Sequence, residues 1–154
     1  MRRAPTSILV VDANIVISAC LGRIGTALLL EATQRYALRT TQRAREEALG
    51  RFKDPRIAAY RPRLDTALAI VPVLPHHVYE ALLPEAEAAL AQAVASGNGS
   101  TTDAHLLATA WVLGCDIWSH DRDFAGTGVS SWSTRNLMSA LAAASLDPPP
   151  KDAS

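Results

Sequence analysis

The chain has 154 residues, of which 49% are hydrophobic and 19% charged, and its formal net charge is zero. This length suits one domain with its own core, and the composition excludes a disordered or fibrous protein. The two cysteines show no CxxC spacing and the N-terminal apolar run is too short for a signal peptide or a membrane span, so we expect a reduced, cytoplasmic protein.

Strand and helix patterns alternate along the first half of the chain. Residues 7–11 form a short apolar run rich in β-branched residues that ends at Asp12, which is typical of a buried parallel strand with a polar residue at its carboxyl end. The patterns that follow predict helices at residues 14–20, 25–35, 41–52 and 63–70, and strands at residues 36–40 and 71–74.

The second half continues the alternation. Residues 78–95 are alanine-rich and helical in pattern, although Pro84 should kink or divide them. Thr102 can cap a helix that begins at Asp103 and stops at Gly114. The remaining pattern predicts strands at residues 116–119 and 129–132 and a closing helix at residues 134–144. We therefore expect a three-layer α/β/α sandwich around a mostly parallel sheet, with one domain over residues 1–145 and a disordered tail over 146–154.

The charges are unevenly distributed. Nine of the fifteen basic residues lie between Arg35 and Arg63, whereas no lysine or arginine occurs from Leu64 to Asp121. One part of the protein can therefore attract phosphate while another gathers carboxylates. A run of charges alone more often marks a solvated helix face, so the interpretation depends on the acidic residues.

Three aspartates are placed to meet at one edge of the predicted sheet. Asp12 and Asp121 follow strands, and Asp103 opens the helix that leads into the strand before Asp121. Ligands of parallel α/β sheets gather at the carboxyl ends of strands. Clustered carboxylates repel one another unless they are protonated, paired or bound to metal, and oxygen ligands favour Mg²⁺ or Mn²⁺ over zinc. Each aspartate alone could equally serve a turn or a helix cap.

The segments VVDANIVISA, TDAHLLATAWVLGCDIWSHDRDF and GTGVSSWSTRNL together resemble the PIN-domain nucleases, a family that includes the VapC-type toxins of bacterial toxin-antitoxin pairs. The resemblance extends from Ile8 to Leu137. It implies a central parallel sheet flanked by helices, and a site of four acidic residues that holds one or two Mg²⁺ or Mn²⁺ ions.

The resemblance also assigns roles to individual residues. Three of the family's metal-binding acids fall on Asp12, Asp103 and Asp121, and the supporting polar positions of its motifs fall on Asn14, Ser119 and Asp123.

The fourth acid of the family is a glutamate on the helix after the second strand, where this chain has Glu46 and Glu47. Adjacent helical residues point about 100° apart, so only one of the two is expected to reach the metal. We favour Glu47, because the family's glutamate is commonly followed by a small or apolar residue, here Ala48.

These assignments predict a metal-dependent endoribonuclease. Water activated by the metal would attack a phosphodiester in line, and the arginines between residues 35 and 63 would hold the RNA backbone without sequence choice. The partners implied are the RNA substrate and, if the protein is a toxin, a cognate antitoxin. We also expect a homodimer.

Other classes of protein fit these residues less well. A phosphoacceptor signalling domain would need a second acid beside Asp12 and a late lysine, and a haloacid-dehalogenase-type phosphatase would need DxD where this chain has DAN. A PIN fold that binds nucleic acid or protein with little turnover remains an alternative. His105 and His120 could shuttle protons, but a surface or hydrogen-bonded role is the simpler interpretation for both.

Overall fold

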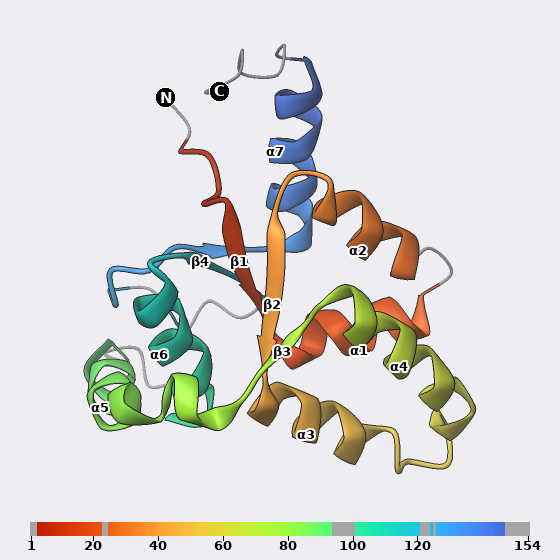
Figure 1. The fold of residues 1–154 in the computed structure, drawn as a ribbon, viewed down its shortest axis with the longest axis horizontal. Helices are drawn as coiled ribbons and strands as arrows, with labels where there is room; N and C mark the ends of the chain where they lie inside the picture. Colours follow the sequence, from red (N-terminus) through yellow and green to blue (C-terminus); the bar gives the residue numbers. More distant parts are fainter. Residues whose placement is uncertain (1–2, 23–24, 94–100, 121–123, 125, 147–154) are drawn as a thin grey trace.

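The fold is built on a five-stranded sheet in which every described strand pairs in parallel with its neighbours. The computed structural model describes residues 3–22, 25–93, 101–120, 124 and 126–146 (Figure 1). The strand order is β3-β2-β1-β4-β5. The strands are β1 (Ile8–Val11), β2 (Ala37–Thr41), β3 (Val73–Leu74), β4 (Asp116–Trp118) and β5 (Ser131–Trp132).

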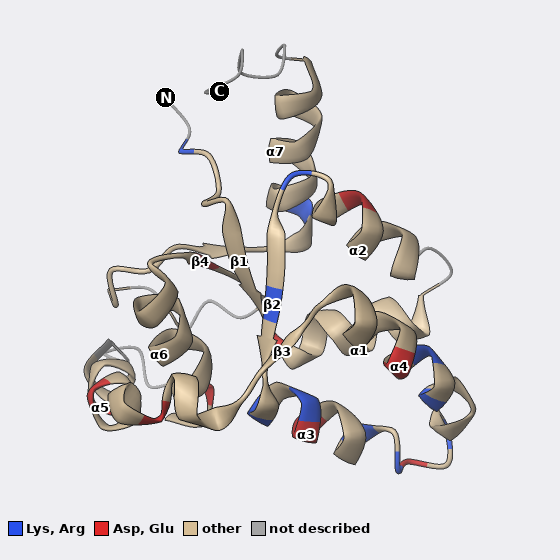
Figure 2. Ribbon diagram, in the orientation of Figure 1, with Lys and Arg blue, Asp and Glu red and all other residues tan. Residues whose placement is uncertain are grey.

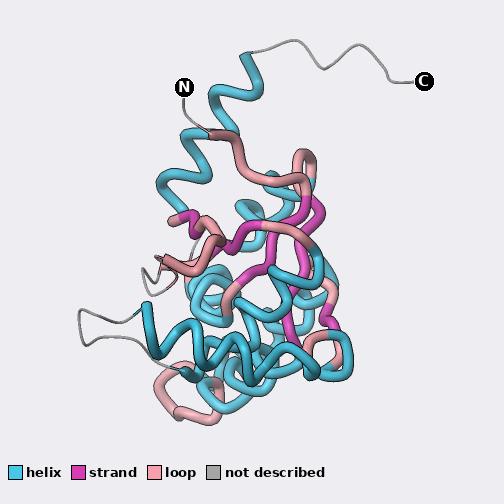
Figure 3. Tube along the Cα trace, turned by 90° about the vertical axis from the view of Figure 1, so that its left-hand side faces the viewer, coloured by secondary structure: helices cyan, strands magenta, loops and turns pink. Residues whose placement is uncertain are grey.

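Helices cover both faces of this sheet, and Figure 3 shows the strands enclosed between them. One face is packed by α5 and α6, and the other by α1 to α4 together with α7. The predicted three-layer α/β/α sandwich is therefore confirmed. The helices are α1 (Ala13–Leu21), α2 (Gly25–Thr33), α3 (Gln42–Arg51), α4 (Arg61–Ile70), α5 (Leu83–Ala93), α6 (Ala104–Leu113) and α7 (Thr134–Leu146). Short 3-10 turns lie at η1 (Ala58–Tyr60), η2 (His76–Val78), η3 (Glu80–Leu82) and η4 (Thr101–Asp103).

The central strand explains why the apolar run at the N-terminus is almost continuous. Leu9 and Val11 of β1 belong to the core on the α1 side, while Val10 between them belongs to the core on the α6 side. All three side chains are fully buried. Because successive side chains of a strand point to opposite faces, a strand covered on both faces must be apolar at every position.

Two local predictions need correction or refinement. The predicted helix over 78–95 is divided: two 3-10 turns come first, and α5 begins just before Pro84, since proline is tolerated in a first helical turn. The prediction that Thr102 caps a helix from Asp103 is wrong, because η4 occupies these residues and Asp103 itself takes the N-cap position. The predicted stop at Gly114 is confirmed by its left-handed φ of 61°.

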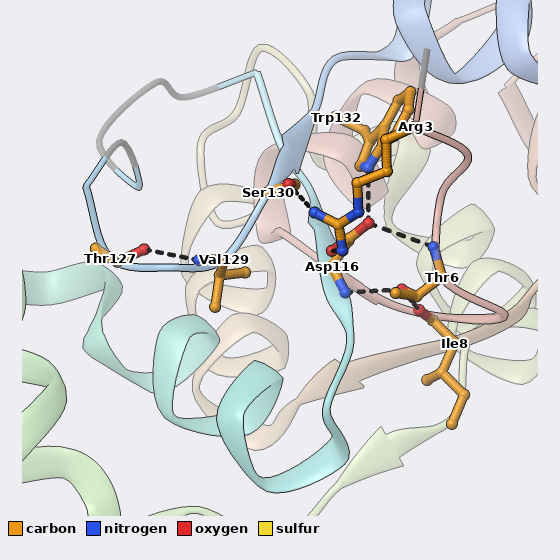
Figure 4. A network of polar contacts seen from close by, with 8 residues as sticks. All are labelled: Arg3, Thr6, Ile8, Asp116, Thr127, Val129, Ser130 and Trp132. Carbon is orange, nitrogen blue, oxygen red and sulfur yellow. Dashed lines mark hydrogen bonds and ion pairs between the residues drawn. The ribbon is translucent and has the colours of Figure 1, made fainter. Parts of the chain in front are cut away.

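A buried carboxylate fixes the N-terminal segment to the amino end of β4 (Figure 4). Asp116 is 2% exposed and accepts hydrogen bonds from Arg3 Nη2 at 2.9 Å, Trp132 Nε1 at 3.0 Å and the Thr6 backbone N at 3.3 Å. Arg3 also donates to Ser130 Oγ. This network lies at the opposite end of β4 from Ser119, so it stabilises the sheet without contributing to that edge.

The length and hydropathy of the helices show whether any of them could span a membrane. None of those in the described part of the chain combines the length and the apolar character needed to cross a bilayer.

Candidate functional site

Asp12 and Ser119 meet where two neighbouring strands end. Asp12 follows β1, is 3% exposed, and donates its backbone N–H to the Trp118 carbonyl at 3.0 Å. Ser119 follows β4 and donates its hydroxyl to Asp12 Oδ2 at 2.6 Å. The strand order reverses between β1 and β4, and this switch point is where parallel α/β sheets place their ligands. The polar ends of two strands therefore form the centre of the site.

Glu47 is the second carboxylate of the site. It projects from α3, and burial together with the negative charge of Asp12 raises its pKa, against a smaller lowering by Arg43. The Arg43 Nε atom lies 3.6 Å from Glu47 Oε1 in a partly exposed pair. Glu46, in contrast, is exposed and accepts a long 3.4 Å hydrogen bond from Gln42. The charge of Glu47 is therefore coupled to that of Asp12.

His105 of α6 closes the inner side of the site. Its Nδ1 lies 2.7 Å from Thr41 Oγ1, and its Nε2 lies 3.7 Å from Glu47 Oε1. Thr41 Oγ1 also accepts from the Ala44 backbone N–H, so this hydroxyl links the His105 ring to the first turn of α3. Burial, and secondarily the charge of Arg43, lowers the pKa of His105 to about 4. The ring is therefore neutral at physiological pH.

Sequence patterns indicate the role of His105 only in general terms. His105 was interpreted as a surface or hydrogen-bonded residue, and it is indeed hydrogen-bonded, but its contact with Glu47 was not anticipated. The contact joins residues 58 positions apart on two helices, so no local pattern signals it.

The other predicted site residues are distributed as follows. Asp103 occupies the half-buried N-cap position of α6, and Asn14 lies exposed in the first turn of α1. Asp121 and Asp123 lie outside the described residues. Among the described residues, no three histidine, cysteine, aspartate or glutamate side chains form a group that could hold a metal ion. The structure thus brings together Asp12, Ser119, Glu47 and His105, and the cluster of four acids stays a prediction.

Two features surround these residues. A cavity of about 580 Å³ opens beside Arg43 and His105, between α3, α5 and α6. Lysine and arginine residues line α3 and the segment that leads to α4, as Figure 2 shows in blue. Some are paired, as in Arg56 with Asp54 and Arg61 with Asp65. Three exposed ones have no ion-pair partner in the described part of the chain: Arg45, Arg51 and Lys53.

The comparisons with known proteins agree on one architecture. The family model for the PIN domain matches residues 10–142. A chain of VapBC2 from Rickettsia felis, solved bound to a DNA fragment from the promoter, is similar with a TM-score of 0.65 and 14% identity over 82% of this chain and 98% of that one. A chain of VapBC-1 from nontypeable Haemophilus influenzae is similar with a TM-score of 0.61 and 17% identity over 83% and 98%. No curated protein matches in sequence.

Proposed function

The chain belongs to the PIN-domain family, and from this premise we propose that it is a metal-dependent endoribonuclease and the toxin of a toxin-antitoxin pair. The family is one of nucleases that generally use divalent metal ions. The RNA substrate, the identity of the metal and the partner are our proposal for this chain.

The electrostatic coupling of Asp12 to Glu47 is the observation that carries the proposal. The negative charge of Asp12, at the strand switch point, raises the proton affinity of Glu47, and Arg43 is a weak partner at 3.6 Å from Glu47. Such a pair is stabilised by a cation between or beside the two groups. Because the donors are carboxylate oxygens, Mg²⁺ and Mn²⁺ fit the set better than zinc.

The proposed ligands combine the described pair with residues assigned by resemblance. Asp12 and Glu47 would hold the metal together with Asp103 and Asp121. The polar positions Asn14, Ser119 and Asp123 would support them. Ser119 has a defined task in this arrangement, since its hydrogen bond to Oδ2 orients the Asp12 carboxylate.

The reaction proposed is hydrolysis of a phosphodiester. A bound metal ion would activate water and offset the negative charge that develops on the phosphate. A bond forms between the water oxygen and phosphorus, the bond from phosphorus to the leaving ribose oxygen breaks, and a proton from the water ends on that oxygen. His105, whose Nε2 lies 3.7 Å from Glu47 Oε1, is neutral and would pack beside that carboxylate without adding charge to the site.

The RNA backbone would lie along the basic residues of α3 and the following segment. Arg45, Arg51 and Lys53 are exposed and without ion-pair partners among the described residues, so they are available to phosphate. Contacts of this kind add affinity that falls with salt and carries no sequence choice.

Two partners follow from the same proposal. Both similar structures are VapBC complexes, which favours an antitoxin encoded beside this chain. We also propose a homodimer. Expression of the chain alone should arrest growth of its host, and co-expression with the product of the adjacent reading frame should relieve the arrest. Harmless expression of an active nuclease would contradict the toxin assignment.

The nuclease activity is tested with a matched pair of aspartate variants. Wild-type protein should cleave single-stranded RNA in Mg²⁺ or Mn²⁺ and stop when EDTA is added. Asp12→Asn should reduce the rate by at least about a hundredfold, since it removes a ligand charge while Ser119 can still donate to the amide oxygen. Asp65→Asn, on the exposed face of α4, should cleave like the wild type.

A binding measurement accompanies the activity assay. Mn²⁺ should raise the melting temperature of the wild-type protein and not that of Asp12→Asn, because the coupled carboxylate pair is then lost. If the wild type neither cleaves RNA nor gains stability from either metal, the competing function of a binding module with little turnover is favoured instead. The lack of a three-ligand group among the described residues is the observation behind that alternative.

A further inference from the structure

We propose that the cavity between α3, α5 and α6 is a nucleobase subsite, which receives one base of the RNA next to the bond that is cut and prefers a base with an exocyclic amino group. This inference rests on the proposed nuclease function and adds a source of sequence preference to it.

The cavity adjoins the carboxylates of the site. Arg43 and His105 both line it, and both also contact Glu47. Its volume of about 580 Å³ falls within the range of pockets that hold small organic groups. A group bound there would therefore lie within one side chain of the proposed metal ligands, as a nucleotide flanking the cleaved phosphate must.

A buried polar atom lies between the cavity residue His105 and Glu47. His105 is 3% exposed, and its Nε2 has no hydrogen-bond partner among the described residues. Buried polar atoms without partners are uncommon in folded proteins and call for an explanation, such as a water or a bound group. Glu47 Oε1 lies 3.7 Å from this atom, just beyond hydrogen-bond range, so His105 links the cavity to the carboxylates of the site.

The charges of the lining favour a base over a phosphate. Two exposed carboxylates line the cavity, Glu46 from α3 and Glu87 from α5, and Arg43 is the one lysine or arginine among the described lining residues. Carboxylates repel phosphate oxygens but accept hydrogen bonds from amino groups, as in the recognition of cytosine N4 by glutamate. Cytosine, adenine and guanine carry such a group, whereas uracil has none.

The cavity also offers an aromatic surface at a fixed orientation. The His76 ring packs edge-on against Tyr79, with centroids 5.1 Å apart and planes at 77°. Its Nδ1 lies 3.3 Å from the Tyr79 hydroxyl, and its backbone N–H donates to Gln42 Oε1 at 3.1 Å. Tyr79 is buried while His76 is exposed, and both rings line the cavity. Unstacked RNA bases bind proteins by stacking on such rings and by hydrogen bonds to their edges.

The chain supplies neighbouring residues as matched controls. Glu85 is exposed on the same helix as Glu87, and His77 is exposed next to His76, but neither lines the cavity. The substrates are two RNA oligonucleotides that differ only by cytosine or uracil at the position beside the mapped cut. Wild-type protein should show a kcat/KM on the order of tenfold higher for cytosine, the size expected of one charged hydrogen bond.

The variants should distinguish a loss of base recognition from a general loss of activity. Glu87→Gln and His76→Ala should reduce the cytosine preference to about twofold or less, whereas Glu85→Gln and His77→Ala should keep it. A uniform fall in rate on both substrates, or unchanged preference in both cavity variants, would overturn the inference. So would variants that cleave normally and lose only the binding of a protein partner.

A binding experiment tests the base subsite independently of catalysis. Asp12→Asn should bind the cytosine oligonucleotide more tightly than the uracil one by fluorescence anisotropy, and Glu87→Gln in that background should abolish the difference. Binding of CMP as tight as that of the oligonucleotide would mean a site for free nucleotides and would overturn the RNA subsite. Base-selective binding without any cleavage by the wild type would instead refute the proposed nuclease and leave the subsite standing.

Discussion

At the scale of single residues, the ionisation of His105 depends on what packs around it. Its ring is buried between Thr41 and Glu47, and the charge of Arg43 adds to the effect of burial in lowering its pKa from 6.5 to about 4. A histidine that is neutral in the folded state binds fewer protons than it does in the unfolded chain between these two pH values. Its contribution to stability is therefore complete above pH 6.5 and is lost as the pH falls toward 4.

The lowered pKa of His105 predicts that the folded protein loses stability in acid. In metal-free buffer, the free energy of unfolding should fall by about 2 kcal/mol between pH 7 and pH 5 through His105 alone. His105→Gln cannot take up the proton, so its urea unfolding should lack this part of the slope, while His77→Gln should retain it. Glu47 acts in the opposite direction, since its raised pKa favours the folded state as it becomes protonated. Equal slopes in the wild type and His105→Gln would show that His105 is not held neutral.

At the scale of secondary structure elements, the packing of α1 against α2 depends on a glycine. A Cβ atom at Gly25 would lie 1.4 Å from the backbone oxygen of Ala19, so the backbone of α2 approaches α1 more closely than any side chain would allow. Gly50, near the end of α3, has nothing within 4 Å of the same position. The two glycines therefore have different reasons to be present.

Alanine substitutions should distinguish the two. Gly25→Ala must displace α2 from α1 and should lower the free energy of unfolding by about 3 kcal/mol or more. Gly50→Ala should raise it by about 0.5–1 kcal/mol, because alanine is the better helix former and meets no obstacle. Chemical denaturation of both proteins checks the pair. A Gly25→Ala protein as stable as the wild type would contradict this prediction, because α1 and α2 could then move apart without loss of stability.

At the scale of the whole molecule, one strand joins two hydrophobic cores. Leu9 and Val11 of β1 pack on the side of α1, and Val10 packs on the side of α6. Ile117 and Trp118 of β4 divide between the two cores in the same way. Neither core can lose its packing without exposing the strands that also support the other, so the two should unfold together.

The tryptophans report on this cooperativity, since Trp118 is buried in one core and Trp111 packs against the other. A variant that retains only Trp118 and another that retains only Trp111 should each show the same urea midpoint by fluorescence and by far-UV circular dichroism. A Trp111 fluorescence midpoint that departs from the circular dichroism midpoint would reveal independent unfolding of the α5 and α6 layer.

Local patterns were sufficient for most of the elements. The apolar run before Asp12, the helix stop at Gly114 and the alternation of strands and helices were all predicted, because backbone preferences and the periodicity of burial act over a few neighbouring residues. The misplaced cap at Thr102 and the divided helix before Pro84 show the limit of such patterns, since a single turn can continue or end with little difference in local energy.

The sequence by itself determined the α/β class, the apolar central strand and the family resemblance. Only the tertiary structure decided that β4 lies beside β1, so that Ser119 reaches Asp12, and that the charge of Glu47 is coupled to that of Asp12. It also placed His105 against Glu47 and opened a cavity beside them. These features depend on strand order and on burial among residues far apart in the chain, and the periodicity of neighbouring residues contains no information about either.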